Sequence, residues 1–289
     1  MKISKAVIVA AGWGTRFLPV TKSIPKEMLP LLDRPMIHHA VAEAVGSGIR
    51  QVVMITARGK QAIADYFADN PELESFLKQK GKEGLYESVR RLSQLADISY
   101  VRQEERLGLG HAILMARDAV GDEPFAVLLP DDIIDSRVPA LKQLIAVFEQ
   151  YNSSVLAVEH IVRQDSVKYG VIEPKPVSAG ISQVLDLVEK PAPADAPSDL
   201  GIVGRYILTP QIFKAIEATA PGRGGEIQIT DALKLLLKQQ AIYALEFDGI
   251  RHDTGTPLGW LKAQLAFALK DPRLGPELRD YLRGLAKDF

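Results

Sequence analysis

The sequence predicts an α/β protein with a Rossmann-like, three-layer α/β/α arrangement, in which helices cover both faces of a mostly parallel, mixed sheet. Apolar, β-branched segments of strand length alternate with helical segments through the first half of the chain. The first of these segments, residues 3–10, is apolar on both faces, as a central parallel strand is. Right-handed crossovers between such strands place helices on both faces of the sheet.

The individual elements follow from hydrophobic periodicity and from the residues that interrupt it. Strands are expected at residues 3–10, 51–56, 99–102, 125–129, 154–159, 169–173, 183–188, 202–208 and 241–247. Helices are expected at residues 35–48, 60–67, 110–120, 137–150, 210–218, 230–240 and 256–270. The last helix has a clear start, since Thr256 suits the N-cap and Pro257 the first helical position. Residues 70–96 are highly charged and interrupt the alternation, which indicates a helical insertion at the rim.

The composition of the chain excludes several classes of protein. Its 289 residues carry a formal net charge of −1 and no cysteine. A disulfide scaffold, a zinc ribbon, an iron–sulfur protein and a cysteine nucleophile are therefore excluded. Bulk electrostatic binding to nucleic acid or to an acidic membrane is disfavoured. No apolar run approaches the ~18 residues of a membrane span, and the first run is too short for a signal peptide. We expect a cytoplasmic protein without nucleic-acid or membrane partners.

A glycine-rich loop follows the first strand and reads Ala10-Ala11-Gly12-Trp13-Gly14-Thr15-Arg16. Glycines at the carboxyl end of a parallel strand let the backbone approach phosphate, although a structural turn explains this short pattern equally well. The dinucleotide fingerprint and the P-loop both fail to match. The proline-rich loop that follows carries Lys22 and Lys26 in addition to Arg16. Such a loop is suited to a polyphosphate, and its alternative interpretation is a solvated basic loop.

Acidic residues follow two other predicted strands. Asp131 and Asp132 end the buried strand at residues 125–129, where a pair of carboxylates suits Mg²⁺ beside phosphates. A helix N-cap or a solvated turn is the alternative for this pair. Glu189 and Lys190 follow the strand at residues 183–188 and, taken alone, indicate no function.

Several of these segments together resemble the nucleotidyltransferases that make nucleotide sugars. The signature is Gly-x-Gly-Thr-Arg-Phe-Leu-Pro, then Thr-Lys, then Pro-Lys-Glu-Met-Leu-Pro, within Gly12–Pro30. Its form is most similar to the bacterial branch that uses UTP and glucose 1-phosphate. Thymidylyl relatives are less similar, since they usually have Lys-x-Leu-Leu-Pro where this chain has Lys26-Glu27-Met28-Leu29-Pro30.

The resemblance extends along nearly the whole chain. The other matching segments are Gln103 with Gly108–Ala112, Leu129–Asp132, Lys168–Ile172, Val188–Pro191 and Gly224–Asp231. Two positions depart from the pattern. One is Trp13, and the other is Asp253-Thr254-Gly255, where the uridylyl branch more often has Asp-Cys-Gly.

The resemblance implies an enzyme that transfers a uridylyl group from UTP to glucose 1-phosphate, giving UDP-glucose and pyrophosphate by a single in-line displacement. The alternatives are a thymidylyltransferase that uses dTTP and a noncatalytic nucleotide-sugar sensor on the same fold. A dehydrogenase is disfavoured because the third glycine of its fingerprint is missing.

The resemblance also assigns roles to residues. Arg16 and Lys26 would neutralise the departing pyrophosphate, and Lys190 would hold the attacking phosphate. Asp131 and Asp253 would face Mg²⁺, and Gly170 and Glu189 would contact the sugar. The expected nucleotide-binding residues are Ala10, Ala11, Gly12, Gly14, Thr15, Glu27, Gln103 and Gly108. His111, which begins a helix inside a matched motif, is expected to position that loop.

The chain length alone fits either one domain or two. Because the candidate site residues run from Gly12 to Asp253, we expect a single domain over residues 1–289. A nucleotide-binding half is expected at about residues 1–135 and a sugar-binding half at about residues 136–250. A C-terminal helical extension at about residues 251–289 completes the chain. The resemblance implies a homodimer or homotetramer, assembled through the helices from Thr256 onward.

Overall fold

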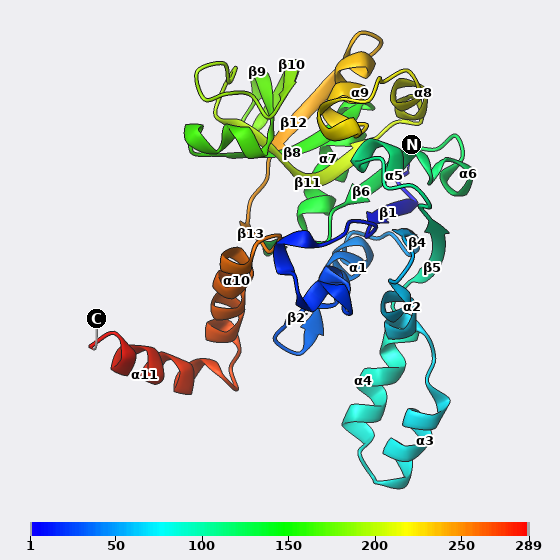
Figure 1. The fold of residues 1–289 in the computed structure, drawn as a ribbon, viewed down its shortest axis with the longest axis vertical. Helices are drawn as coiled ribbons and strands as arrows, with labels where there is room; N and C mark the ends of the chain where they lie inside the picture. The colour runs from blue at the N-terminus through cyan, green and yellow to red at the C-terminus, as the bar shows by residue number, and fades with distance from the viewer. Residues whose placement is uncertain (1, 288–289) are drawn as a thin grey trace.

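A nine-stranded mixed sheet organises residues 2–287, the part of the chain described by this computed structural model (Figure 1). The strand order is β5-β4-β1-β6-β11-β8-β12-β10-β9. The bounds are β1 Lys5–Val9, β4 Gln51–Thr56, β5 Asp97–Arg102, β6 Phe125–Leu128, β8 Ser154–His160, β9 Gly170–Ser178, β10 Ile181–Glu189, β11 Leu200–Leu208 and β12 Ile242–Glu246. Every expected strand is therefore present, with shifts of a few residues at the ends.

The two halves of the sheet differ in strand direction. β5, β4, β1 and β6 run parallel to one another, as the alternating sequence predicts. β11 then runs antiparallel to both β6 and β8, and β9 and β10 form an antiparallel hairpin. β9 and β10 are antiparallel because they are joined by a tight turn with Gly180 at φ 70°, which leaves no room for a crossover helix.

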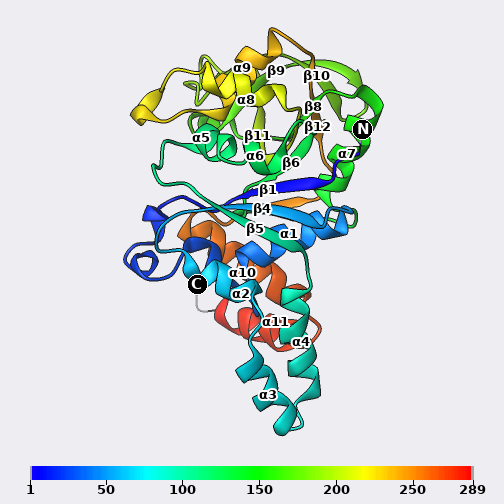
Figure 2. The ribbon, with the colours of Figure 1, turned by 90° about the vertical axis from the view of Figure 1, so that its right-hand side faces the viewer.

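Helices cover both faces of the sheet, as expected for three layers (Figure 2). Ile8 of β1 packs in one apolar cluster with α1 (Met36–Gly46), α2 (Gln61–Phe67) and α7 (Ala140–Tyr151). Val7 of the same strand packs in the opposite cluster with α5 (Leu109–Leu114), α8 (Gln211–Glu217) and α9 (Ile229–Leu237). Successive residues of β1 thus serve opposite faces, which buries the three central residues of the strand.

Two helical segments lie outside the three layers. α3 (Pro71–Gln79) and α4 (Glu83–Ser93) form the expected insertion and project away from the sheet beyond α2 (Figures 1 and 2). α10 (Pro257–Lys270) begins at Thr256, whose hydroxyl accepts the Gly259 N–H at 3.1 Å, so the expected cap is present. α10 continues into α11 (Gly275–Leu285), a helix that periodicity did not predict.

Three further features differ from the expected elements. The helix expected at residues 110–120 is divided into α5 and α6 (Arg117–Val120), because the Ala116 N–H bonds to Ile113 in a tighter turn. β2 (Pro30–Leu31) and β3 (Arg34–Pro35) form a small hairpin. β7 (Asp132–Asp135) pairs antiparallel with β13 (Ile250–Asp253), and this β7–β13 ribbon brings the end of the chain back to its first half.

Within residues 2–287, none of the helices has the length and apolar character that crossing a bilayer demands.

Candidate active site

A cleft of about 840 Å³ is lined by residues from both halves of the sheet and from the β7–β13 ribbon. It brings together seven of the candidate site residues, which are Arg16, Lys26, Asp131, Gly170, Glu189, Lys190 and Asp253. These residues come from distant parts of the chain, so the cleft exists only when the whole domain is folded.

The two predicted metal-binding carboxylates meet at one end of the cleft, which we call the carboxylate end. The Thr254 backbone N–H and hydroxyl both donate to the Asp131 carbonyl, at 2.8 and 2.7 Å, and this joins the two loops. A Cβ atom placed on Gly255 would lie 3.0 Å from Asp253 Oδ1 and 3.1 Å from Asp131 Oδ2. Both oxygens thus approach the same point, which the glycine leaves open.

Two predicted cations lie beside these carboxylates. Lys26 Nζ lies 2.6 Å from Asp131 Oδ2, and Arg16 Nη1 donates to the Gly255 carbonyl at 3.4 Å. Burial by itself would lower the pKa of Lys26, but the charges of Asp131 and Glu27 raise it above its ordinary value. Burial opposes the ionised form of Asp131 as well, yet Lys26 holds the pKa of that carboxyl below its usual range. The pair is therefore ionised at neutral pH.

Asp132 has a different environment from its neighbour. Its Oδ2 accepts the Gly204 N–H at 3.0 Å, and its Oδ1 accepts Arg251 Nε at 2.5 Å. Gly204 has to be a glycine, because a Cβ there would lie 2.5 Å from Asp132 Oδ2. Both carboxylate oxygens of Asp132 are thus bound to the protein itself.

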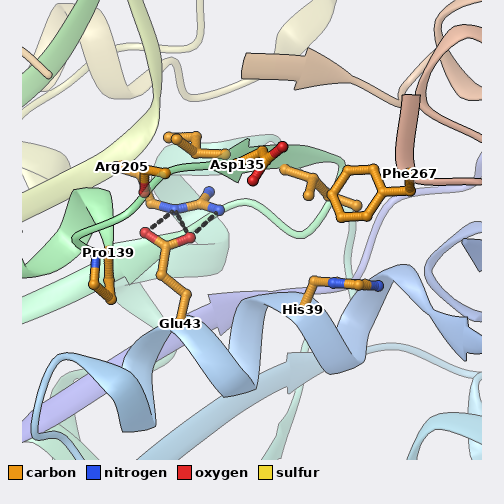
Figure 3. A pocket seen from close by; sticks show the side chains of 9 residues that line it. His39, Glu43, Asp135, Pro139, Arg205 and Phe267 are labelled. Atoms are coloured by element: carbon orange, nitrogen blue, oxygen red, sulfur yellow. Dashed lines mark hydrogen bonds and ion pairs between the residues drawn. The ribbon is translucent and has the colours of Figure 1, made fainter. Parts of the chain in front are cut away.

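Arg205 supports the turn that carries Asp131, and sequence reasoning did not select it. Its side chain is buried in β11 and forms an ion pair with Glu43 of α1, with Nη2 2.8 Å from Oε2 (Figure 3). Nη1 donates to the Leu129 carbonyl at 2.9 Å and Nη2 to the Asp132 carbonyl at 2.6 Å. An arginine inside an otherwise apolar strand is a signal that could have identified it, since a buried charge needs such partners.

Glu189 and Lys190 also line the cleft, and we call their part of it the sugar end, after the contacts expected there. Glu189 Oε2 accepts the Thr230 hydroxyl at 2.7 Å, and Lys190 Nζ lies 3.0 Å from Glu189 Oε1. Lys190 has φ 48°, a left-handed conformation that is strained for a lysine, and its N–H donates to the Tyr169 carbonyl at 2.9 Å. At Gly170 a Cβ would lie 2.7 Å from Thr230 Oγ1, so the backbone passes close to the hydroxyl that donates to Glu189.

The predicted nucleotide-binding residues belong to the glycine-rich loop, to the loop that follows it and to the segment after β5, and none of them is among the residues that line the cleft. Ala10 N–H donates to Ile55 and Gln103 N–H to Thr56, both at 2.8 Å, so these residues follow β1 and β5, the two strands that flank β4, at the carboxyl edge of the sheet. The space above Gly12 is open, with no heavy atom within 4 Å of a Cβ placed there. Gly14 has φ 70° and its carbonyl accepts the Thr21 hydroxyl at 2.8 Å, which turns the loop into the short helix Thr15–Phe17.

Gln103 is buried, and its amide Nε2 lies 2.8 Å from His111 Nδ1 and 3.4 Å from the Gly108 carbonyl. His111 thus holds the Gln103 amide, in keeping with the expected positioning role. Glu27 is also buried, where both of its carboxylate oxygens lie 2.7 Å from Lys60 Nζ. This ion pair keeps the Glu27 carboxylate engaged with the protein.

Trp13 and Arg106 join the glycine-rich loop to the segment that follows Gln103. The Arg106 guanidinium carbon lies 3.3 Å from the centre of the Trp13 ring, and Nη2 donates to the Arg58 carbonyl at 3.2 Å. Burial lowers the pKa of Arg106. Sequence reasoning noted Trp13 only as a departure from a motif and did not consider Arg106.

The donor set at the carboxylate end fits a hard cation such as Mg²⁺. Asp131 and Asp253 supply carboxylate oxygens, and Mg²⁺ commonly takes one or two protein carboxylates together with substrate phosphates and water. Among residues 2–287, no group of three or more histidine, aspartate or glutamate side chains could enclose a metal by itself. A cation at this end would therefore depend on oxygens of the substrate.

A Rossmann-like sheet with a glycine-rich loop, basic side chains and paired carboxylates at its carboxyl edge defines a nucleotide-binding α/β enzyme. Comparison with known proteins narrows this class. The family model described as nucleotidyl transferase matches residues 5–269, and the chain belongs to this family.

Relatives of this chain are similar over nearly their full length. A UTP–glucose-1-phosphate uridylyltransferase of Staphylococcus epidermidis is 48% identical over 284 residues, which cover 98% of this chain and 99% of the relative. The enzyme of the same name from Bacillus subtilis is 46% identical, with 98% and 97% covered.

Solved structures show the same fold. A UDP-glucose pyrophosphorylase complexed with UDP-glucose superposes with a TM-score of 0.86 at 43% identity, covering 93% of this chain and 100% of that one. A UTP-bound relative from Acinetobacter baumannii superposes with a TM-score of 0.90 at 38% identity, covering 97% and 99%. The family and the Rossmann-like fold expected from the sequence are thereby confirmed.

Proposed function

We propose that this chain transfers the uridylyl group of UTP to glucose 1-phosphate, forming UDP-glucose and releasing pyrophosphate. The observation that carries the proposal is the similarity of 46–48% over nearly the whole chain to uridylyltransferases. The cleft supports it, because cations, paired carboxylates and a second lysine face one space. Relatives with UTP and with UDP-glucose bound share the fold that builds this cleft.

In the proposed reaction, a phosphate oxygen of glucose 1-phosphate attacks the α-phosphorus of UTP. The bond from that phosphorus to the bridging oxygen breaks, and pyrophosphate leaves with the electron pair. The nucleophile is already an anion, so no general base is needed. Catalysis then consists of positioning and charge neutralisation.

The chain's own residues divide this work between the two ends of the cleft. Arg16 and Lys26 balance the charge of the departing pyrophosphate, and Lys190 holds the attacking phosphate. Glu189, fixed by Thr230, accepts hydrogen bonds from sugar hydroxyls, and Gly170 lets the backbone lie against the sugar. Ala10, Ala11, Gly12, Gly14, Thr15, Glu27, Gln103 and Gly108 bind the nucleotide, and an ion pair with Lys60 holds the Glu27 carboxylate in place.

Asp131 and Asp253 would hold Mg²⁺, which supplies a positive charge that stabilises phosphate oxygens as negative charge moves onto the leaving group. Removing Mg²⁺ and adding it back tests this proposed metal dependence. Activity that disappears with a chelator and returns with Mg²⁺ is expected in the wild type. Full activity in the chelator would contradict it.

The decisive experiment follows pyrophosphate release with glucose 1-phosphate and, separately, UTP, dTTP, CTP, ATP and GTP. Release mainly with UTP is expected. Exclusive release with dTTP would replace the uridylyl assignment with a thymidylyl one. The absence of release with every nucleotide, together with measurable UDP-glucose binding, would favour a noncatalytic sensor.

We also propose that residues 1–289 act as one domain, that copies associate into a homodimer or homotetramer, and that the protein is cytoplasmic. The continuous sheet across both halves supports the first point. For the second, the exposed large apolar side chains of α10, of α11 and of the residue before α11 are Leu258, Leu261, Leu265, Leu274, Tyr281 and Leu285. If light scattering shows a stable monomer, the proposed oligomer is wrong. The location rests on the cysteine-free composition.

A further inference from the structure

Arg251 connects the carboxylate end of the cleft to its sugar end. It lies in β13, and its guanidinium is almost completely buried in the cleft wall. Nε pairs with Asp132 Oδ1 at 2.5 Å, and Nη1 contacts both the Glu159 carboxylate and the Tyr169 hydroxyl, the latter at 3.2 Å. One side chain thus joins β7, β8 and the segment that leads into β9.

The connection continues to the proposed phosphate-binding lysine. The Tyr169 carbonyl accepts the Lys190 N–H at 2.9 Å, and Lys190 has the left-handed backbone conformation described above. A strained conformation persists only where neighbouring contacts fix it. Tyr169 is one of those contacts, and Arg251 fixes Tyr169 through its hydroxyl.

At its other end, Arg251 acts on the residue beside Asp131. Asp132 accepts hydrogen bonds from both Arg251 and Gly204, which sets the direction of the short segment that also carries Asp131. The two ends therefore share one guanidinium. Arginine suits this role because its planar donors can bind several acceptors in fixed directions, which a lysine ammonium cannot.

We propose that Arg251 is a positioning residue that sets the distance between Lys190 and Asp131, and thereby aligns the attacking phosphate with the nucleotide. Arg251 does not touch the reacting atoms in this assignment. It acts through Tyr169 on one side and through Asp132 on the other. The inference rests on the proposed function, because the alignment matters only if Lys190 and Asp131 bind the two substrates.

The test compares Arg251→Ala, Arg251→Lys and Tyr169→Phe with the wild type. In Arg251→Ala we expect kcat to fall about 10²-fold, the size of effect that a displacement of about 1 Å produces. The affinity for UTP, measured by calorimetry, should change less than about threefold, since the glycine-rich loop is untouched. Arg251→Lys should stay below about a tenth of the wild-type kcat, because one ammonium cannot serve all three partners. Tyr169→Phe should have the smallest decrease in kcat of the three variants.

Two further measurements separate positioning from general loss of structure. Hydrogen exchange should become faster in peptides covering residues 166–171 and 188–192 of Arg251→Ala, and stay unchanged in α1 and α7. Guanidinium ion added at millimolar, non-denaturing concentration should restore part of the kcat of Arg251→Ala and none of the kcat of Arg251→Lys. Arg117→Met is the matched control, since Arg117 pairs with Glu217 at the surface away from the cleft, and its kcat and exchange should equal those of the wild type.

The outcomes separate this inference from the proposed function. Unchanged kcat and unchanged exchange in Arg251→Ala would overturn the positioning role while leaving the proposed function intact. Faster exchange throughout the protein, with UTP affinity lost in proportion to kcat, would also overturn it and make Arg251 a general structural residue. A wild type that releases no pyrophosphate would refute the proposed function. Exchange at residues 166–171 and 188–192 would then still decide whether Arg251 fixes Lys190.

Discussion

The two ends of the cleft hold their charges in different ways. At the carboxylate end, Asp131 and Asp132 each pair with a base from a distant segment, Lys26 and Arg251 respectively. At the sugar end, the charged pair consists of chain neighbours, Glu189 and Lys190, with the lysine side chain 38% exposed.

This difference shows two means of preorganising charge. Long-range pairs in a buried setting cannot rearrange without moving whole strands, and they act in surroundings where charge is poorly screened. A neighbouring pair depends on local backbone geometry, here the left-handed Lys190 and the Thr230 contact to Glu189. We therefore expect substitutions at the carboxylate end to cost more catalysis than those at the sugar end.

The largest effect is expected for Asp131→Asn. This change removes a charge beside the phosphates and leaves Lys26 without its ion pair. In steady-state assays kcat should fall about 10³-fold, at the upper end for loss of one preorganised electrostatic group. Asp118→Asn, at an exposed position of α6, is the control and should keep full activity. A near-normal rate in Asp131→Asn would reject the role of this carboxylate.

Lys190→Ala should have the second largest effect. We expect kcat to fall about 10²-fold and KM for glucose 1-phosphate to rise, since the attacking phosphate loses its cation. UTP affinity and the midpoint of thermal unfolding should stay close to wild type, because the side chain is partly exposed. Lys175→Ala on the exposed part of β9 serves as control. If UTP affinity falls while kcat stays unchanged, Lys190 binds UTP and not glucose 1-phosphate, and the proposed role is wrong.

Acid should weaken the nucleotide half more than the sugar half. Burial, with Arg34 nearby, lowers the pKa of both His38 and His39 of α1 to about 4. The unfolded chain, with a pKa of about 6.5, binds protons that the folded chain excludes, so stability is complete above pH 6.5 and falls toward pH 4. In urea unfolding we expect a loss of about 2 kcal/mol for each of these two histidines between pH 7 and pH 5.

The control for this pH dependence lies in the sugar half. Bonds to Asp199, together with Glu246, raise the pKa of the exposed His160, so its ion pairs strengthen below pH 6.5 and fade as pH rises through the raised value. His160→Gln should therefore make the free energy of unfolding fall slightly more steeply in acid. The double variant His38→Gln with His39→Gln should flatten this fall. An unchanged profile in the double variant would exclude these two histidines as its cause.

The smallest effect concerns Gly170→Ala. The added methyl would lie 2.7 Å from Thr230 Oγ1 and press on the contact that fixes Glu189. We expect about 1 kcal/mol of lost stability in urea unfolding and a severalfold rise in KM for glucose 1-phosphate. Gly84→Ala in α4 meets nothing within 4 Å and should instead add about 0.5 kcal/mol. A neutral Gly170→Ala would show that the sugar end tolerates more displacement than its contacts indicate.

Sequence reasoning located the parts of the site whose chemistry is written in neighbouring residues. The glycine-rich loop and Leu129–Asp132 each combine the end of a parallel strand with charged or glycine residues, and such ends lie along one edge of a parallel sheet. Glu189–Lys190 follows a strand that is antiparallel to both of its neighbours, and only the family resemblance pointed to it. Sequence reasoning could not locate Arg205 or Arg251. Their partners are backbone carbonyls and carboxylates that become neighbours only when β11 and β13 reach their places.

The same limit applies to the fold. Periodicity predicts strands and helices one by one, so the parallel half of the sheet and the buried faces of β1 followed from it. The antiparallel direction of β11 depends on contacts with β6 and β8, which are far away in the sequence. The β7–β13 ribbon was missed for the same reason, since neither strand has an apolar run of its own.

The place of β11 has a consequence for synthesis on the ribosome. β11 lies between β6 and β8, so those two strands, although made earlier, have an open edge between them until residue 208 has emerged. Asp253 arrives later still. We therefore expect a nascent chain to complete the sheet only after residue 208 has emerged, and the carboxylate end of the cleft only after Asp253 has followed.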